Sequence, residues 1–141
     1  MSDSAPHVRL ERTYRFTAAH FYWDASRSAA ENERLFGKCA NRHGHGHDYR
    51  LEIVLQGSPD PATGMVFDLR ELDRIVADAV LQHLDHRNIN HEVEWFASRQ
   101  PTCENLALFA WSVLAGQLPS GLLASTRVRE TDDLAAEYRG A

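Results

Sequence analysis

The sequence predicts an α+β domain in which two helices lie on one face of a four-stranded antiparallel sheet. Four segments alternate apolar and polar residues, the pattern of half-buried strands, and two segments repeat apolar residues at helical spacing. Along the chain they follow the order strand, strand, helix, helix, strand, strand. A chain of 141 residues has room for one core, so we expect a single domain over residues 1–141 with its core at about 8–140.

The first two predicted strands cover Val8–His20 and His47–Gln56. In each strand, alternate positions are apolar, and these positions share one face. Arg12 interrupts the inner face of the first strand, and His20 ends it. The apolar positions of these two strands are Val8, Leu10, Tyr14, Phe16, Ala18, Tyr49, Leu51, Ile53 and Leu55.

Two amphipathic helices follow, after a dense turn signal at residues 57–64. The spacing predicts the first over Leu69–Leu84, with Asp68 as N-cap and Glu71 completing a capping box. Thr102 is the expected N-cap of the second, which the turn at 119–121 ends. Two shorter elements are also expected: a surface helix within Arg27–Arg34 and a strand at Met65–Phe67.

The chain closes with two more predicted strands. The first runs from Leu122 to Glu130, a tight turn occupies Asp132 and Asp133, and the last strand covers Leu134–Tyr138. The inner face of the third strand therefore ends in the carboxylate of Glu130.

Composition excludes several classes of protein. The hydrophobic content of 43% and charged content of 25% are ordinary for a globular protein, and the net charge of −5 gives no basic footprint for nucleic acid. No apolar run is long enough to span a membrane, and Met1–Glu11 has no apolar signal-peptide region. Two cysteines without such a signal predict reduced thiols and a cytoplasmic location.

Three histidines alternate with glycines just before the second strand. His43, His45 and His47 project to one side of an extended chain, where two such imidazoles can supply two edges of a zinc tetrahedron. A tag remnant or a solvated loop is the plain alternative. However, the histidines continue the apolar face of the following strand, which favours a metal. His20 is either a hydrogen-bonded core histidine or, if the two strands pair, the third ligand, leaving one position open for catalysis.

Further residues have the chemistry of acids and bases. Cys39 is either a small buried hydrophobe or a thiol whose neighbours Lys38 and Arg42 favour the thiolate.

Asp85 and His86 either decorate a helix end or form an oriented proton carrier. Glu130 is either a solvated carboxylate or an anchor that accepts two N–H donors from a planar heterocycle. Cys103 is predicted to be structural.

The motifs resemble a known family in order and over almost the whole chain, from about Tyr14 to Gly140. They are Phe-Thr-Ala-Ala-His20, Phe-Gly-Lys-Cys39, Gly-His45-Gly-His47-Asp-Tyr, Asp-Pro-Ala-Thr-Gly-Met, Leu-Asp85-His86, Thr102-Cys-Glu104-Asn and Val-Arg-Glu130-Thr. This set is similar to the 6-pyruvoyl-tetrahydropterin synthases. The related 6-carboxy-tetrahydropterin synthases of queuosine precursor biosynthesis share most of it.

The resemblance implies a tunnelling fold, in which three subunits pool their sheets into a barrel and two rings stack as a homohexamer. It implies the substrate 7,8-dihydroneopterin triphosphate and a Zn²⁺ ion held by His20, His45 and His47. By resemblance, Cys39 abstracts a proton with Asp85 and His86 as relay, and triphosphate leaves. Glu130 would hold the pterin with Thr102 and Glu104 nearby, in a site shared between subunits. No nucleic acid or membrane partner is implied.

Two departures leave alternatives open. Carboxy-type members often place the metal pair where His43 and His45 stand, although the following Asp48-Tyr49 favours His45 and His47. Cys103 stands where relatives usually carry Ser or Thr. The product is expected to be the pyruvoyl-tetrahydropterin, with the carboxy product as the alternative.

Two other functions compete: a non-catalytic pterin- or zinc-binding module, and metal-assisted hydrolysis of another heterocycle. The basic residues that hold the triphosphate are not identified, with Lys38, Arg42 and Arg87 as candidates.

Overall fold

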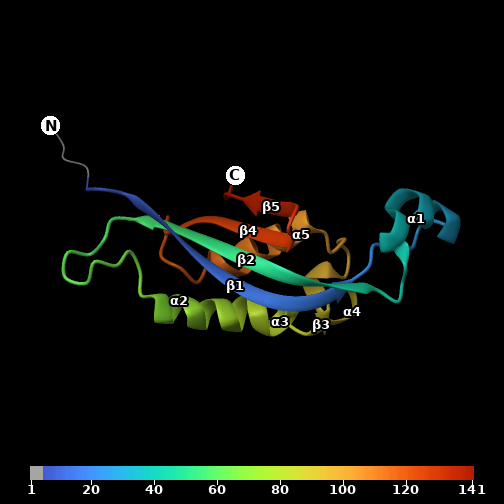
Figure 1. Ribbon diagram of the computed structural model, residues 1–141, viewed down its shortest axis with the longest axis horizontal. Coiled ribbons are helices and arrows are strands. Elements are labelled where there is room, and N and C mark those ends of the chain that lie inside the picture. Colours follow the sequence, from blue (N-terminus) through green and yellow to red (C-terminus); the bar gives the residue numbers. More distant parts are fainter. Residues whose placement is uncertain (1–4) are drawn as a thin grey trace.

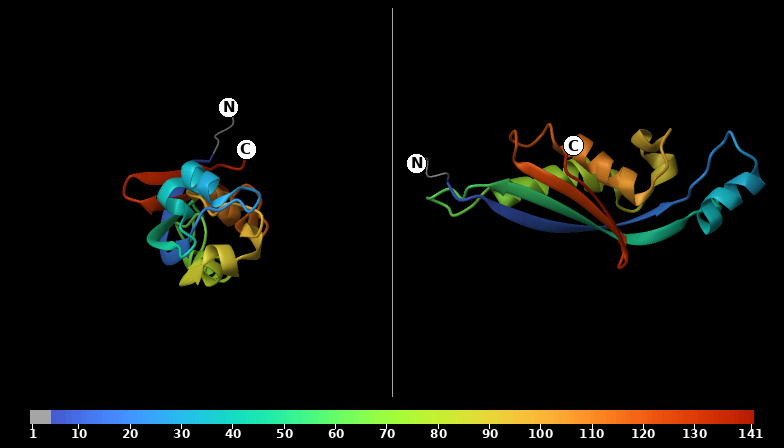
Figure 2. Two further views of the ribbon diagram at one scale, coloured as in Figure 1. Left: turned by 90° about the vertical axis from the view of Figure 1, so that its right-hand side faces the viewer. Right: turned by 90° about the horizontal axis from the view of Figure 1, so that it is seen from above.

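The computed structural model describes residues 5–141, and residues 1–4 of the polar N-terminal segment lie outside the described part. The fold is α+β, a single five-stranded sheet in the order β3-β1-β2-β4-β5 with helices on one face (Figures 1 and 2). The strands are β1 (Val8–His20), β2 (His45–Gly57), β3 (Arg87–Asn88), β4 (Leu123–Thr131) and β5 (Leu134–Tyr138).

The first two strands form a long antiparallel pair that spans the molecule. Its register runs from Val8 opposite Gly57 to His20 opposite His45. The pairing on which a role for His20 as third ligand depended is therefore present, and His20 and His45 are direct cross-strand neighbours. Because side chains alternate along a strand, His47 lies on the same face as both.

Two helical segments cover the inner face. The first begins at α2 (Leu69–Val76), continues through a single π-helical turn, η2 (Ala77–Leu81), and ends in α3 (Gln82–Leu84). The second is α5 (Cys103–Leu114). Both predicted N-caps are confirmed: the side chain of Asp68 accepts from Arg70 N, and that of Thr102 accepts from Asn105 N.

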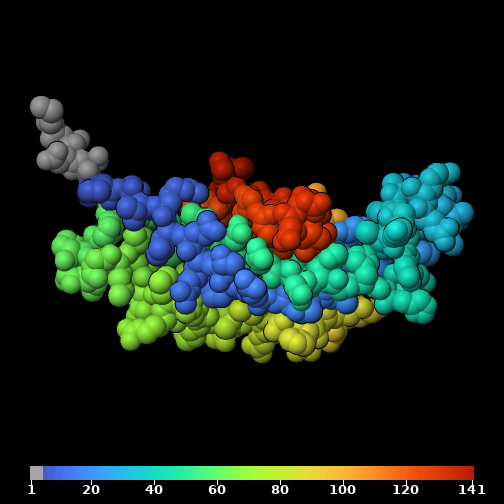
Figure 3. Space-filling model, in the orientation of Figure 1, coloured from blue at the N-terminus to red at the C-terminus, as the bar shows by residue number. Residues whose placement is uncertain are grey.

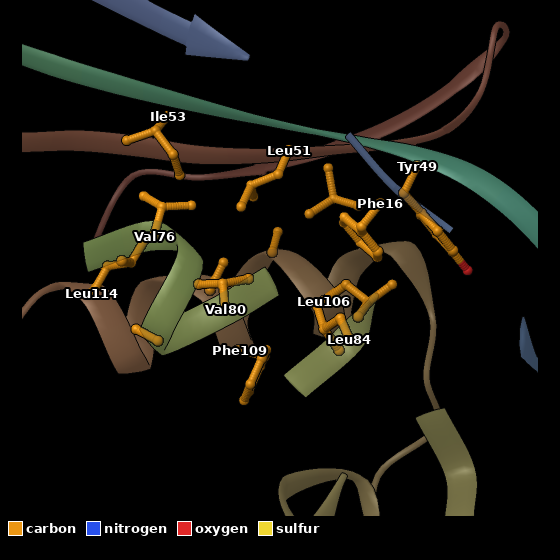
Figure 4. Packing of buried hydrophobic residues seen from close by; sticks show 14 of the residues in the cluster. Phe16, Tyr49, Leu51, Ile53, Val76, Val80, Leu84, Leu106, Phe109 and Leu114 are labelled. Carbon is orange, nitrogen blue, oxygen red and sulfur yellow. The ribbon is translucent and has the colours of Figure 1, made fainter. Parts of the chain in front are cut away.

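The core lies between the sheet and these helices, as Figure 4 shows. Leu51 and Ile53 of β2 are fully buried and point toward Val76, Val80 and the α5 side chains. At about 25 cal/mol per Å² of buried apolar surface, such residues supply the main driving force for folding. The labelled core residues are Phe16, Tyr49, Leu51, Ile53, Val76, Val80, Leu84, Leu106, Phe109 and Leu114.

Arg12 does not disturb this core. Its guanidinium forms two hydrogen bonds to the Asp73 carboxylate, at 3.1 and 2.9 Å, and Tyr14 OH donates to the same carboxylate at 2.6 Å. The polar interruption of the inner face of β1 thus ties the strand to α2.

Several element predictions were wrong. Met65–Phe67 is not a strand, and Glu71 pairs with Arg74 instead of closing a capping box on Asp68. The sheet has a fifth strand, β3, which pairs parallel with β1 at Ala18 and Ala19 only. The α4 turn (Ile89–Glu92) and η3 (Glu94–Phe96) were also missed because such short turns have no periodicity to read.

The chain forms an elongated body with a separate lobe at one end (Figure 3). This lobe is the connection between β1 and β2 and contains α1 (Ala29–Phe36) and the 3₁₀ turn η1 (Gly37–Ala40). The sheet is open: from Val8 to Thr17 the second edge of β1 has no partner strand within residues 5–141, and β5 forms the other edge. None of the helices within residues 5–141 combines the length and the apolar content needed to cross a membrane.

Candidate metal and acid–base site

Three histidines converge at the end of the β1–β2 pair. One ring nitrogen from each of His20, His45 and His47 lies within 4.8 Å of the others, and the Nε2 atoms of His20 and His45 are 3.0 Å apart. Tetrahedral zinc with bonds of 2.0–2.1 Å separates its nitrogen ligands by roughly 3.3 Å. The described residues of the chain therefore contain a three-histidine group with the spacing of a metal site.

Local structure fixes the direction of each ring. The ring of His20 is fully buried, and its Nδ1 donates to the carbonyl oxygen of Pro101 at 2.8 Å, which leaves Nε2 free toward the other histidines. Gly44 adopts φ +81, and an added Cβ would lie 3.4 Å from the His20 carbonyl oxygen. Glycine at this position therefore lets the chain turn sharply into β2 directly before His45.

The environment keeps the imidazoles neutral, which is the form that binds a metal. Burial lowers the pKa of His20 to about 4, and burial likewise lowers the pKa of His45 and of His47. His47 Nε2 is a buried nitrogen with no hydrogen-bond partner within residues 5–141. A buried polar atom without a partner is unfavourable, so this nitrogen is poised to bind an ion. The three imidazole nitrogens of His20, His45 and His47 are ligands of the kind that zinc binds.

Glu130 joins the histidines from β4. One of its carboxylate oxygens, Oε1, lies 3.5 Å from His20 Nε2 and 4.0 Å from His47 Nε2, and Tyr49 OH donates to it at 3.5 Å. Burial raises the pKa of Glu130. Tyr49, fully buried and also 3.1 Å from His20 Nδ1, is a site residue that the sequence analysis placed in the core and in a family motif but not in the site. Its position two residues after His47, on the same strand face, could have indicated that Tyr49 lies beside the histidines.

Cys39 lies in η1 at the same end of the molecule. Its carbonyl oxygen accepts a hydrogen bond from Tyr22 N at 2.7 Å, which ties it to the segment just after His20. Burial, and then the charge of Glu130, raise the pKa of Cys39 in the chain alone, so the basic neighbours Lys38 and Arg42 do not by themselves lower it. Arg42, one of those neighbours, instead stacks its guanidinium over the Trp23 ring at 4.9 Å.

Two side-chain amides that the sequence did not flag hold the segment after His20. Asn90 accepts from Phe21 N at 2.9 Å and donates to Phe21 O at 2.8 Å. Gln100 makes the same pair of bonds with Trp23, at 3.1 and 2.8 Å. Each amide thus replaces a strand partner, and Tyr22 between them is held in place to bind Cys39 O.

Asp85 and His86 lie away from the histidine group, beside Thr17 of β1. Asp85 Oδ1 accepts from Thr17 N at 2.9 Å and lies 3.0 Å from His86 Nδ1, and His86 N donates to Thr17 O at 2.6 Å. His86 has φ 60, a left-handed conformation that non-glycine residues adopt mainly where surrounding contacts enforce it. The pair lines a cleft of about 550 Å³ on the sheet face away from the helices.

The remaining predicted residues are divided among several places. Thr102 uses its hydroxyl as the α5 cap, and the charge of nearby Glu104 contributes to the raised pKa of Glu130. Cys103 is buried, donates to Val128 O at 3.0 Å and has its pKa raised to about 11 by burial, as expected of a structural thiol.

The three candidates for binding triphosphate do not meet. Lys38 and Arg42 line an open concavity of about 800 Å³ beside η1, together with His43, which is exposed and outside the histidine group. Arg87 pairs with Glu92 at 3.3 Å.

Comparisons with known proteins agree with this geometry. The family model for 6-pyruvoyl tetrahydropterin synthase matches residues 9–141. The human 6-pyruvoyl tetrahydrobiopterin synthase is 40% identical over 133 residues, covering 94% of this chain and 92% of the human protein. The Drosophila melanogaster protein of that name is 40% identical, covering 96% and 81%. The solved Caenorhabditis elegans 6-pyruvoyl tetrahydropterin synthase superposes with a TM-score of 0.91 at 36% identity, covering 97% and 98%.

The protein has an open α+β sheet with three histidines converging on two paired strands, and it matches pterin enzymes over nearly its whole length. The fold and the site together define it as a pterin synthase. Within that class, the chain belongs to the 6-pyruvoyl tetrahydropterin synthase family.

Proposed function

We propose that the protein is a zinc-dependent carbon–oxygen lyase that converts 7,8-dihydroneopterin triphosphate to 6-pyruvoyl-tetrahydropterin with release of inorganic triphosphate. The observation that carries the proposal is the convergence of His20, His45 and His47 around one point, with Glu130 beside them. The shared name of the human and Drosophila relatives, at 40% identity, supports the pyruvoyl product.

In this proposal each side chain has one task. His20, His45 and His47 would hold the zinc ion, which would supply Lewis-acid polarisation of the side-chain oxygens of the substrate. The buried Glu130 carboxylate accepts N–H donors of the pterin ring and so orients it, with Thr102 and Glu104 nearby.

Cys39 takes the proton from the side-chain carbon of the substrate once its thiol is ionised. Asp85 holds the His86 ring at 3.0 Å, and His86 returns the proton.

A site shared between subunits would bring Asp85 and His86 together with Cys39 and the three histidines. Asp85 and His86 line the cleft away from the helices, whereas Cys39 and the histidines lie at the end of the β1–β2 pair. We propose that a neighbouring subunit brings its own pair to this site within a homohexamer, a dimer of trimers. The unpaired edge of β1 and the β5 edge offer the backbone groups that would join subunits into a ring.

The location of the enzyme is part of the proposal. Cys39 and Cys103 are both free cysteines, and the proposed base must stay reduced, which a cytoplasmic location would ensure.

Three alternatives remain to be separated. One is a carboxy-tetrahydropterin synthase of queuosine precursor biosynthesis, which would act on the same substrate and differ in product. Another is a pterin- or zinc-binding module without catalysis, and the third is hydrolysis by metal-activated water, which would not need Cys39.

The test is incubation of the zinc-loaded protein with 7,8-dihydroneopterin triphosphate, followed by assay of triphosphate and mass spectrometry of the pterin. We expect triphosphate and 6-pyruvoyl-tetrahydropterin, with turnover falling at least about hundredfold in Cys39→Ala, because a general base contributes about 10²–10⁴-fold. Cys103→Ser, which keeps a hydrogen-bond donor to Val128 O, is the matched control and should retain turnover. Absence of triphosphate release by the zinc-loaded protein would refute the proposal, and a carboxy-pterin would assign it to the other branch.

A further inference from the structure

The sheet face that the helices leave uncovered carries three arginines in one row. Arg15 of β1 lies directly opposite Arg50 of β2, and Arg50 lies directly opposite Arg129 of β4. All three alternate with buried residues, so their side chains stand on the face away from the core. Like charges directly opposite one another destabilise paired strands, so folding alone does not account for this row.

The neighbouring row on the same face shows what a balanced arrangement looks like. There, Arg127 Nε lies 2.9 Å from a Glu52 carboxylate oxygen, an ion pair without hydrogen-bond alignment, and Arg127 Nη1 lies 3.9 Å from Glu137. In the arginine row, only Arg129 approaches a carboxylate, at 3.8 Å, and that carboxylate is the Glu52 already paired with Arg127.

Arg15 and Arg50 have no such partner. Across residues 5–141, no carboxylate lies within ion-pair distance of either side chain. Two adjacent guanidinium groups are therefore available to an external anion.

The three arginines line the cleft of about 550 Å³ that Asp85 and His86 also line. Two of the carboxylates that line it bind neighbouring groups of the cleft instead of the arginines: Asp48 accepts from Thr17 Oγ1 at 2.8 Å, and Asp85 is bound to Thr17 N and His86. Asp132 also lines the cleft and gives its carbonyl oxygen to Arg129 at 3.2 Å. Within residues 5–141, the guanidinium groups of Arg15 and Arg50 have no hydrogen-bond or ion-pair partner, and that of Arg129 is only partly engaged.

We propose that Arg15, Arg50 and Arg129 form a polyphosphate-binding row that receives the triphosphate group of the substrate. This inference rests on the proposed function, which supplies a substrate of that class. Adjacent strands lie about 4.8 Å apart, so the row spans roughly 10 Å and offers one planar guanidinium for each of several phosphate groups. Guanidinium forks bind phosphate oxygens through parallel charge-assisted hydrogen bonds. The row also brings the anion next to His86, the proposed proton carrier.

The test is calorimetric titration of the purified protein with inorganic triphosphate. In Arg50→Gln, we expect affinity to fall at least about tenfold, the effect of losing hydrogen bonds to a charged group. The melting temperature should stay equal or rise, because the substitution relieves repulsion on both sides of β2. Arg9→Gln is the matched control, on the same strand and face as Arg15 but opposite Gln56, and should bind triphosphate as the wild type does.

A second pair of variants tests the competing location. If Lys38→Gln with Arg42→Gln weakens triphosphate binding while Arg15→Gln with Arg50→Gln does not, the row is not the anion site and the inference is overturned. Absence of triphosphate binding by the wild-type protein would overturn it as well.

Turnover separates this inference from the proposed function. Arginine-dependent triphosphate binding without conversion of the pterin triphosphate would uphold the row and refute the proposed reaction. Conversion of the pterin triphosphate with unchanged KM and unchanged triphosphate binding in the row variants would uphold the proposed reaction and refute the row.

Discussion

At the scale of single residues, the site depends on which histidines face inward. His45 and His47 lie on the inner face of β2 with His20 opposite, whereas His43 precedes the strand and is exposed. Both pairs have the same i, i+2 spacing, so spacing alone could not separate His43 and His45 from His45 and His47. The position where β2 begins decides between them.

This gives a direct prediction for metal binding. His47→Ala should lower zinc affinity by more than the about 10–100-fold that follows loss of an outer-shell partner, because it removes a ligand. The measurement is competition for zinc with a chromophoric chelator. His43→Ala is the matched control and should bind zinc like the wild type; the opposite ranking of the two variants would contradict the assignment.

At the scale of elements, the lobe between β1 and β2 holds Cys39 in place. Its centre is Asn32, which is fully buried although polar. The Asn32 amide accepts from Asp24 N at 2.7 Å and donates to the carbonyl oxygens of Asp24, Arg27 and Ser28 at 3.0 to 3.3 Å. A helix of eight residues is too short to be stable alone, so α1 depends on this network.

We therefore expect Asn32→Ala to destabilise the lobe by about 1–3 kcal/mol, because buried backbone groups lose their partners. Hydrogen exchange measured by mass spectrometry should show faster exchange over residues 24–40 and unchanged exchange in α5. Asn41→Ala serves as the control, because it is an exposed position in the same connection whose side chain accepts, among residues 5–141, only from His43 N. Equal protection of the lobe in Asn32→Ala and the wild type would disprove the role of Asn32.

At the scale of the whole molecule, the important feature is the open sheet, whose two edges have unpaired backbone groups within residues 5–141. The edge of β1 from Val8 to Phe16 and the edge strand β5 both expose backbone hydrogen-bonding groups. Long open edges invite pairing with another chain, and unlike edges that pair head to tail close into rings.

The expected assembly is a homohexamer with six times the 16.0 kDa mass of one chain. Light scattering coupled to size-exclusion chromatography measures this mass directly. A monomer at the concentrations used for assay, with full turnover, would show that one chain supplies the whole site and would exclude the shared arrangement of Cys39, Asp85 and His86.

Much of the fold was predictable because its signals are local. Alternation located four of the five strands, helical spacing located both covering helices, and Asp68 and Thr102 marked where those helices begin. The short β3 pairing and the two turns after it carried no such signal, since two residues cannot display a period. The position of Glu130 on the inner face of its strand could also be predicted from the alternation, before its neighbours were known.

The sequence by itself determined the strand and helix pattern, the family motifs and the inward face that His20, His45 and His47 share. Only the tertiary structure decided that Glu130 and Tyr49 lie against those histidines, that Cys39 is partly buried with a raised pKa, and that three arginines stand in one row. The physical reason is register. Side-chain direction along a strand follows from backbone geometry, but which residue lies opposite which depends on how segments far apart in the chain align.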